Sequence, residues 1–363
     1  MTRHLAESET TLKEALEILR RLAEKNPQKF EPYVAKVINS LAILYSDTQR
    51  FAESETMHKE ALEILRRLAE KNPQAYEPDV ADVLNNLAIL YGKTKRYAES
   101  ESMYKELENI FRRLAEKNSQ AYEPYVAHSL NNLAGLYQKI QRFTESETMY
   151  KEALEIRRRL AEKNPLVYEF DVAASLYNLA LLYQRTQHFT KSEIMYKEAL
   201  EILRRLAKEN PQAYEPYVAS ILNNLAILYS ATQRFAESET KHKEALEIFR
   251  RLAEKNPQAY EPDVADAFNN LAFNCIFLSK FDEAEQYARK GLEIDDTQTS
   301  IYTNLAASLL FQGKYEEAEQ IYRKYKEELK EGFLGDLEEF KKAGIIPEKY
   351  IDDVESIKHI LNE

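Results

Sequence analysis

Acidic residues outnumber basic ones in this chain of 363 residues, 61 against 50, and the net charge is −11 at pH 7. Nucleic acid is therefore not an expected partner, since an acidic chain gains nothing from neutralising phosphates. No apolar run reaches the roughly 18 residues that span a membrane, and the N-terminus lacks the apolar segment of a signal peptide. The one cysteine, Cys275, excludes a disulfide within the chain, and we expect a cytoplasmic protein.

The N-terminal segment, residues 1–31, matches only half of a pattern that recurs later. His4-Leu5-Ala6-Glu7-Ser8 parallels Arg50-Phe51-Ala52-Glu53-Ser54, so this segment is predicted to be the second helix of a hairpin whose first helix is absent. Leu12 and Leu19 would then lack one neighbour. We expect another molecule, a further domain or self-association to cover this edge, because solenoid ends otherwise expose apolar surface.

A period of 46 residues runs through the middle of the chain. It is plainest in a dipeptide that recurs as Asn26-Pro27, Asn72-Pro73, Asn118-Ser119, Asn164-Pro165, Asn210-Pro211 and Asn256-Pro257. The segment Leu41–Tyr45 returns at the same interval, and the last step, from Leu271 to Leu305, shortens to 34 residues. We therefore predict six units over residues 32–299 and a final shorter unit over 300–331.

Each unit is predicted to form two helices, since apolar residues recur at helical spacing. In the second full unit, the first helix is expected to begin at Pro78, whose missing N–H costs nothing at a helix start, and to end near Lys93. A polar turn, Thr94–Arg96, leads to a second helix, Tyr97 to about Lys117. Asn118 should end that helix.

The repeat pattern ends after Lys330. Residues 332–363 are predicted to form two capping helices, Leu334–Lys342 and Pro347–Leu361, separated by Gly344.

The repeated positions resemble those of a known family. The last unit carries its small and aromatic pattern at Leu305-Ala306, Leu309, Gly313, Tyr315, Ala318 and Tyr322, which resembles the tetratricopeptide repeat. The longer units, with Asn85–Tyr91, look most like the kinesin-light-chain-type repeats of many bacterial proteins. The resemblance implies an all-α solenoid, a right-handed superhelix of helical hairpins, whose concave groove binds other proteins.

The first helix of each unit offers candidate binding residues. On a helical wheel at 100° per residue, Leu84, Leu87 and Tyr91 form the packed arc, and the resemblance implies that the opposite arc lines the groove. A pair of asparagines recurs there, giving the candidate peptide contacts Asn85, Asn86, Asn131, Asn132, Asn178, Asn223, Asn224, Asn269, Asn270 and Asn304.

Asparagine is a poor helix former, so this series should have a reason. A carboxamide both donates and accepts hydrogen bonds, which suits the backbone of an extended peptide. We expect these side chains to be largely free of partners within the chain. The alternatives are that duplication copied them, or that they bond between adjacent helices.

An apolar line accompanies the asparagines. Its candidate anchors are Ile89, Leu181, Ile227, Phe273 and Phe277. It broadens towards the C-terminus through Ile276, Leu310 and Phe311, where we expect the terminal helices to fold over it, with partner binding as the alternative.

No catalytic or metal-binding pattern is present in the sequence. His58 and His242 replace tyrosines of other units and are predicted to be packing residues, and Cys275 likewise is predicted to be a small core residue. The sequence has neither a phosphate-binding loop nor a pair of metal-ligating histidines. We predict a scaffold without enzymatic activity, cofactor or metal that binds an extended segment of a partner protein. The alternative is the regulatory or sensor arm of a larger signalling protein whose N-terminal effector domain is absent from this chain.

Overall fold

The computed structural model describes residues 2–362, and side chains from Leu5 onward. Within this range it contains seventeen α-helices, one short 3-10 helix and no strand, so the prediction of an all-α fold is confirmed. No helix of the described residues is long and apolar enough to cross a membrane. The chain divides into two compact units, Met1–Leu182 and Tyr183–Glu363.

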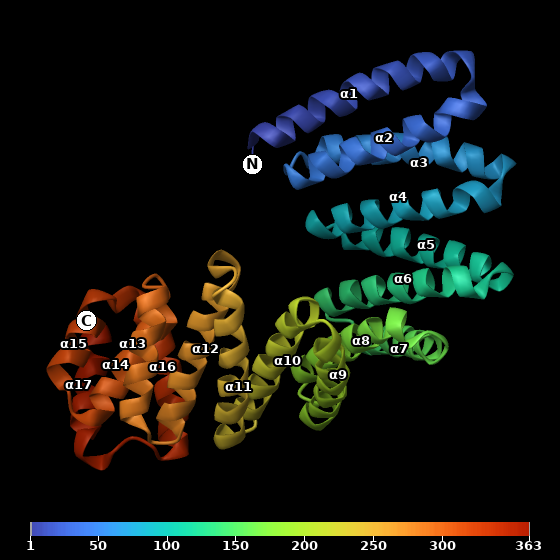
Figure 1. Cartoon of the computed structure of the whole chain (residues 1–363). Helices are drawn as coiled ribbons and strands as arrows, with labels where there is room; N and C mark the ends of the chain where they lie inside the picture. The colour runs from blue at the N-terminus through green and yellow to red at the C-terminus, as the bar shows by residue number, and fades with distance from the viewer. Residues whose placement is uncertain (1, 363) are drawn as a thin grey trace. The chain divides into compact units, whose positions relative to one another are not determined.

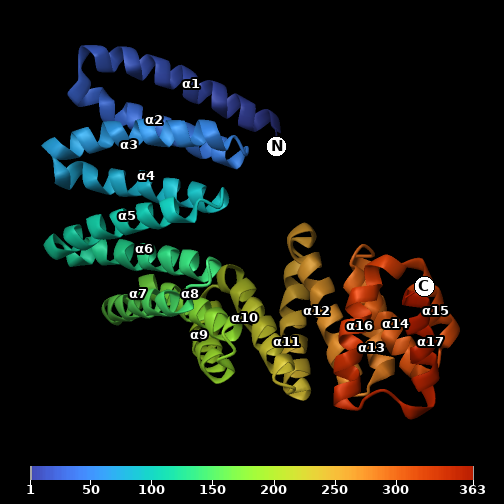
Figure 2. The same cartoon turned by 180° about the vertical axis from the view of Figure 1, so that it is seen from behind.

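The first unit contains α1 Thr2–Lys25, α2 Pro27–Asp47, α3 Phe51–Lys71, α4 Pro73–Lys93, α5 Tyr97–Lys117, α6 Ser119–Lys139, α7 Phe143–Lys163 and most of α8 Pro165–Arg185. The second contains α9 Phe189–Glu209, α10 Pro211–Ala231, α11 Phe235–Ala253, α12 Pro257–Phe277, α13 Phe281–Ile294, α14 Thr299–Gln312, α15 Tyr315–Lys324, α16 Lys326–Ala343, the 3-10 helix Glu348–Tyr350 and α17 Ile351–Asn362. Within the first unit, α1 to α6 lie layer upon layer, each packed against the next (Figures 1 and 2).

The predicted packed arc forms the core between these layers. In α4, Leu84, Leu87 and Tyr91 are buried, as the helical wheel predicts. A contact that the sequence did not suggest joins the two helices of a hairpin: the Ser100 hydroxyl of α5 donates to the Ala88 carbonyl oxygen of α4 at 2.7 Å. The same buried bond recurs in other units, from Ser54, Ser146 and Ser238.

The first helix of each unit begins earlier than predicted. Helix α4 starts at Pro73 rather than Pro78, and Asn72 caps it by accepting from the Ala75 backbone N–H at 3.3 Å. The pair of an asparagine cap and a proline at the first helical position is the stronger start signal, and Pro78 is tolerated inside the helix, where it removes one backbone hydrogen bond. The predicted boundary between residues 31 and 32 accordingly falls inside α2.

A single asparagine therefore connects the last helix of one repeat to the first helix of the next. Asn118 ends α5, with its backbone N–H bonded to the Leu114 carbonyl oxygen, and its side chain caps α6. One residue leaves little freedom for the angle between the two helices it joins.

Replacing Asn118 with alanine should lower the free energy of unfolding by about 1 kcal/mol, because the Ala121 N–H loses its acceptor. Replacing it with serine, which keeps an acceptor oxygen, should retain most of the stability. Urea unfolding of the two variants beside the parent protein measures the difference. Equal stability of the alanine variant and the parent would contradict the capping role.

The N-terminal helix α1 packs along α2. Leu12 and Leu19 are half-buried against the core of the first unit, whereas Ile18 is half exposed.

The C-terminal helices cover the apolar patch, as predicted, but their bounds differ. The ring of Phe340 on α16 lies 5.2 Å from Phe277 and 5.6 Å from Phe311. Helix α16 begins at Lys326, not Leu334, because the buried stripe of Leu329, Phe333, Leu337 and Phe340 continues past two glycines. An apolar stripe at helical spacing outweighs the helix propensity lost at single glycines.

Asp336 of α16 makes this cap sensitive to pH. Burial, and then the nearby charge of Glu339, raise its pKa to about 6. Burial, and then the charge of Asp336, raise the pKa of Tyr322, whose buried hydroxyl has no hydrogen-bond partner among the described residues. The folded protein therefore holds the proton of Asp336 more tightly than the unfolded chain does.

Since the folded pKa exceeds the ordinary value near 3.9, the contribution of Asp336 to stability should be complete below about pH 4 and lost as the pH rises through 6. Asp336→Asn should be more stable than the parent at pH 7.5, by on the order of 1–3 kcal/mol. That advantage should shrink on acidification to pH 4.5. Urea unfolding at both pH values, with the exposed Glu338→Gln as control, tests this, and a constant difference would contradict it.

Candidate functional site

The paired asparagines form a ladder of hydrogen bonds between successive helical hairpins, which are the repeats of the chain. In the first compact unit, residues 1–182, Asn86 Nδ2 donates to Asn39 Oδ1 at 3.3 Å. The same bond, always 47 residues apart, joins Asn132 to Asn85 at 3.1 Å and Asn178 to Asn131 at 2.8 Å. The expectation that these amides are largely free of partners was wrong, because the first helices of neighbouring units lie close enough for their amides to meet.

The second unit continues the pattern with local changes. Asn270 donates to Asn223 at 3.4 Å and Asn304 to Asn269 at 2.8 Å. Asn224 donates to the Ser220 carbonyl oxygen of its own helix at 2.9 Å. Of the candidate asparagines, Asn304 is buried and the others are half-buried.

The two amides of α4, Asn85 and Asn86, take part in two different rungs and use only part of their hydrogen-bonding capacity. A carboxamide has two donor hydrogens and an oxygen that accepts two bonds. Asn85 accepts through Oδ1, and no described residue accepts from its Nδ2. Asn86 donates one hydrogen, and no described residue donates to its Oδ1. The rungs thus hold the helices in register and keep donors and acceptors half exposed.

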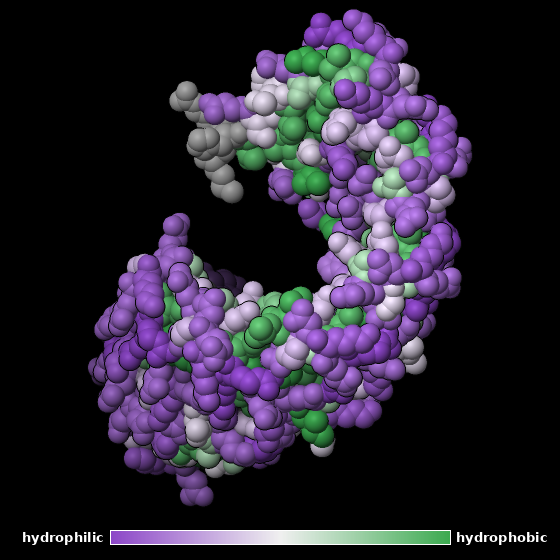
Figure 3. All heavy atoms as spheres, turned by 45° about the vertical axis from the view of Figure 1, so that its right-hand side comes forward, coloured by the Kyte–Doolittle hydropathy of each residue, from purple (hydrophilic) through white to green (hydrophobic). Residues whose placement is uncertain are grey.

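The predicted apolar anchors lie on the same side of the helices. We call this side, with the asparagines and these anchors, the ladder face. Ile89 is 40% exposed and Ile227 37% exposed, whereas Leu181, Phe273 and Phe277 are half-buried. The ring of Phe340 packs on the last two, so the chain covers these two anchors itself. In the view of Figure 3, hydrophilic residues cover most of the surface and hydrophobic ones reach it in separate patches.

Replacing Asn132 and Asn178 together with alanine should destabilise the protein. Each lost bond contributes about 1 kcal/mol net and leaves a half-buried acceptor unpaired, which exceeds the several tenths of a kcal/mol gained in helix propensity. Ser40→Ala is the matched control, since Ser40 holds the ladder position in α2 and, among the described residues, its hydroxyl bonds to the Lys36 carbonyl oxygen of its own helix alone. Denaturant unfolding should show a loss in the double variant alone. Unchanged stability would mean that the rungs are weak.

A second polar junction, which sequence reasoning missed, recurs between units. Glu55 of α3 accepts from the Tyr91 hydroxyl at 3.2 Å and pairs with Arg96 at 2.6 Å and with Lys59 at 2.7 Å. The Arg96 guanidinium lies 4.3 Å above the Tyr91 ring. Glu9, Glu101 and Glu193 make equivalent junctions. The sequence signal for this junction is that Glu, Tyr and Arg recur at the same spacing in several repeats. It is not recognisable as a local motif, because the glutamate and the arginine lie 41 residues apart.

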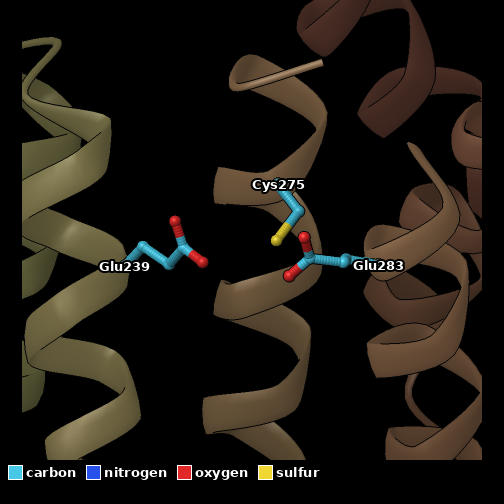
Figure 4. Close-up of side chains that lie close together, drawn as sticks. All are labelled: Glu239, Cys275 and Glu283. Carbon is cyan, nitrogen blue, oxygen red and sulfur yellow. The ribbon is translucent and has the colours of Figure 1, made fainter. Parts of the chain in front are cut away.

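In the second unit, Cys275 takes the place of the tyrosine in such a junction. Its thiol, on α12, lies between the carboxylates of Glu239 on α11 and Glu283 on α13 (Figure 4), with donor atoms within 4.8 Å of one another. Glu239 is already paired with Lys243 at 2.6 Å and Lys280 at 2.8 Å. Burial, and then these carboxylates, raise the pKa of Cys275 to about 12.

A protonated thiol and a carboxylate already neutralised by two lysines are poor ligands for a metal ion. The cluster is therefore a variant of the structural junction. Cys275 belongs to the hydrophobic core, as predicted. His58 and His242 are both buried as well, as predicted for packing residues, and His58 Nδ1 also lies 2.9 Å from Oδ1 of the rung residue Asn39.

Comparisons with known proteins agree with this architecture. Family models described as tetratricopeptide repeat match residues 33–113, 125–205 and 217–297, and a further one matches 299–324. No curated protein matches the chain.

Solved structures provide further similarities. BtubC (BKLC) from P. vanneervenii is 25% identical, with a TM-score of 0.57 over 69% of this chain and 92% of that one. RapI in its apo form is 17% identical, with a TM-score of 0.61 over 99% and 96%. A STAND signal-transduction ATPase with a tetratricopeptide repeat sensor, from Pyrococcus horikoshii, is 15% identical, with a TM-score of 0.63 over 92% of this chain and 49% of that one. At 17% and 15% identity, the last two similarities concern the fold alone.

Proposed function

Because this chain belongs to the tetratricopeptide repeat family, whose repeats mediate protein–protein interaction, we propose that it is a scaffold that binds an extended segment of a partner protein on its ladder face. The proposal depends on one observation above all. In the first unit, half-exposed amides with unused donors and acceptors alternate with exposed isoleucines, Ile43 and Ile89.

The spacing of the rungs suits an extended peptide and does not depend on its sequence. Helices in contact lie about 8–10 Å apart, and an extended chain rises about 3.3 Å per residue. One rung therefore matches about three residues of a bound segment. The amides would contact its backbone, whatever its sequence.

Selectivity would come from the positions beside the asparagines. One position on the ladder face changes from Lys36 on α2 to Asp82 on α4, His128 on α6 and Ala174 on α8. A constant set of amides with variable neighbours separates affinity for a backbone from discrimination between side chains. No described residues form a catalytic constellation that would favour an enzyme instead.

A library of random peptides displayed on phage tests the proposal. Peptides selected on the parent protein should bind it in titration calorimetry, and Ile89→Ser should weaken them at least tenfold, since burying such a side chain contributes about 1.5–3 kcal/mol. Glu63→Ser, an exposed change on α3 away from the ladder face, should leave binding unchanged. A failure to select any peptide, or binding that survives the Ile89 change, would contradict the proposal.

A further inference from the structure

Arg157 stands at a position that is apolar in four other repeats. At intervals of 46 residues, the equivalent positions in α3, α5, α9 and α11 hold Leu65, Phe111, Leu203 and Phe249. All four are buried, and Arg157 itself is only 8% exposed. The chain has placed a guanidinium where its other units place a core side chain.

The partners of Arg157 are neutral. Nη1 donates to the Ser175 hydroxyl at 2.7 Å and to the Asp171 backbone oxygen at 3.2 Å, both on α8. No carboxylate of the described residues pairs with it within 4.0 Å. Arginine has five N–H donors, and those on Nε and Nη2 have no acceptor in the described chain. Its neighbour Arg159 is more typical, since that exposed side chain pairs with Glu123.

A buried cation without an ionised partner is expensive, and an apolar residue of similar volume is usually the more stable choice. Burial lowers the pKa of Arg157, and only the charge of Asp171, beyond pairing distance, opposes this effect. The other units show that leucine and phenylalanine fit the position. Stability alone therefore does not account for the arginine.

The guanidinium lies beside the ladder. Asp171 and Ser175, which it contacts, share one stripe of α8 with the rung residue Asn178, at spacings of four and three residues. On the other side, burial and then the charge of Arg157 lower the pKa of His128 on α6. His128 Nε2 is 3.1 Å from Nδ2 of the rung residue Asn132. The helix that Arg157 bonds to, and the histidine that its charge affects, therefore each carry or contact a rung residue.

We propose that Arg157 is the anion-recognition point of the ladder face and binds the carboxylate of an aspartate or glutamate side chain in the bound peptide. This inference rests on the proposed function and names the chemistry of its partner. A carboxylate accepts two parallel bonds from the fork of an arginine, which matches the donors left unused on Nε and Nη2.

The charge of the rest of the chain makes this recognition selective. The net charge is −11. At the ladder-face position beside the asparagines, an acidic side chain of the peptide would meet Asp82 on α4, or Lys36 on α2, whose charge is already paired with Asp79 at 3.7 Å. Like charges disfavour a wrong alignment. One acidic residue would thus fix the register of the peptide along otherwise uniform rungs.

Arg157→Leu is a suitable test because it restores the residue that Leu65 and Leu203 provide at equivalent positions. The probe is the same phage-displayed random peptide library, selected in parallel on the parent protein and on this variant. Peptides enriched on the parent should share one Asp or Glu at a fixed distance from an apolar residue, and those enriched on the variant should lack it. Arg159→Ala is the control and should enrich the same peptides as the parent.

Synthetic peptides give the quantitative test. Changing the shared acid to its amide, or Arg157 to leucine, should each raise Kd at least tenfold, and the two changes together should add nothing further. Peptides with amidated and free C-termini should bind equally. A requirement for the free C-terminus would overturn the assignment to a side-chain carboxylate.

The outcomes separate this inference from the proposed function. Peptides that bind the parent and Arg157→Leu equally would overturn the role of Arg157 alone. If no peptide is selected on either protein, the proposed function fails with it. A melting temperature for Arg157→Leu equal to or above that of the parent is expected, whereas a clear fall would show that Arg157 is structural and overturn the inference.

Discussion

A helical hairpin of this chain cannot bury its own apolar residues. Leu84 and Leu87 of α4 are shielded from solvent only when hairpins pack on both sides. This dependence on neighbours is the general constraint on repeat proteins. Two polar contacts then fix how neighbours meet: the asparagine rung and the junction of Glu55 with Tyr91 and Arg96. Apolar burial drives the stacking, and the directional contacts select one register.

The fold was largely predictable because a period of 46 residues constrains every unit at once. Positions that differ from the pattern were predicted less well. The start of α4 was misplaced because two prolines, Pro73 and Pro78, compete as start signals, and only the side chain of Asn72 decides between them. Helix α16 was predicted too short because local glycines were given more weight than its buried stripe.

The site was predictable by location and not by contacts. The wheel placed Asn86 and Ile89 on one side of α4, but whether an amide is free depends on the distance to the next helix, which sequence does not contain. The rung between Asn86 and Asn39 joins residues 47 apart, beyond any local motif. Arg157 could have been noticed by comparing the units with one another, since it replaces Phe111 and Leu203 at fixed spacing. Its burial and its neutral partners required the structure.

The recurring junction of Glu, Tyr and Arg has a consequence for how such a chain changes length. Recombination between its repeated coding segments removes or adds 46 residues, and each new interface would then be closed by residues already present. Loss of 73–118 would bring Glu55 of α3 to Tyr137 and Arg142, which now meet Glu101 in the same way. Copy number can therefore vary without new packing having to evolve. Arg157 is the exception, because no other repeat has an arginine at this position. It would remain a single recognition point on a ladder face whose number of repeats can change.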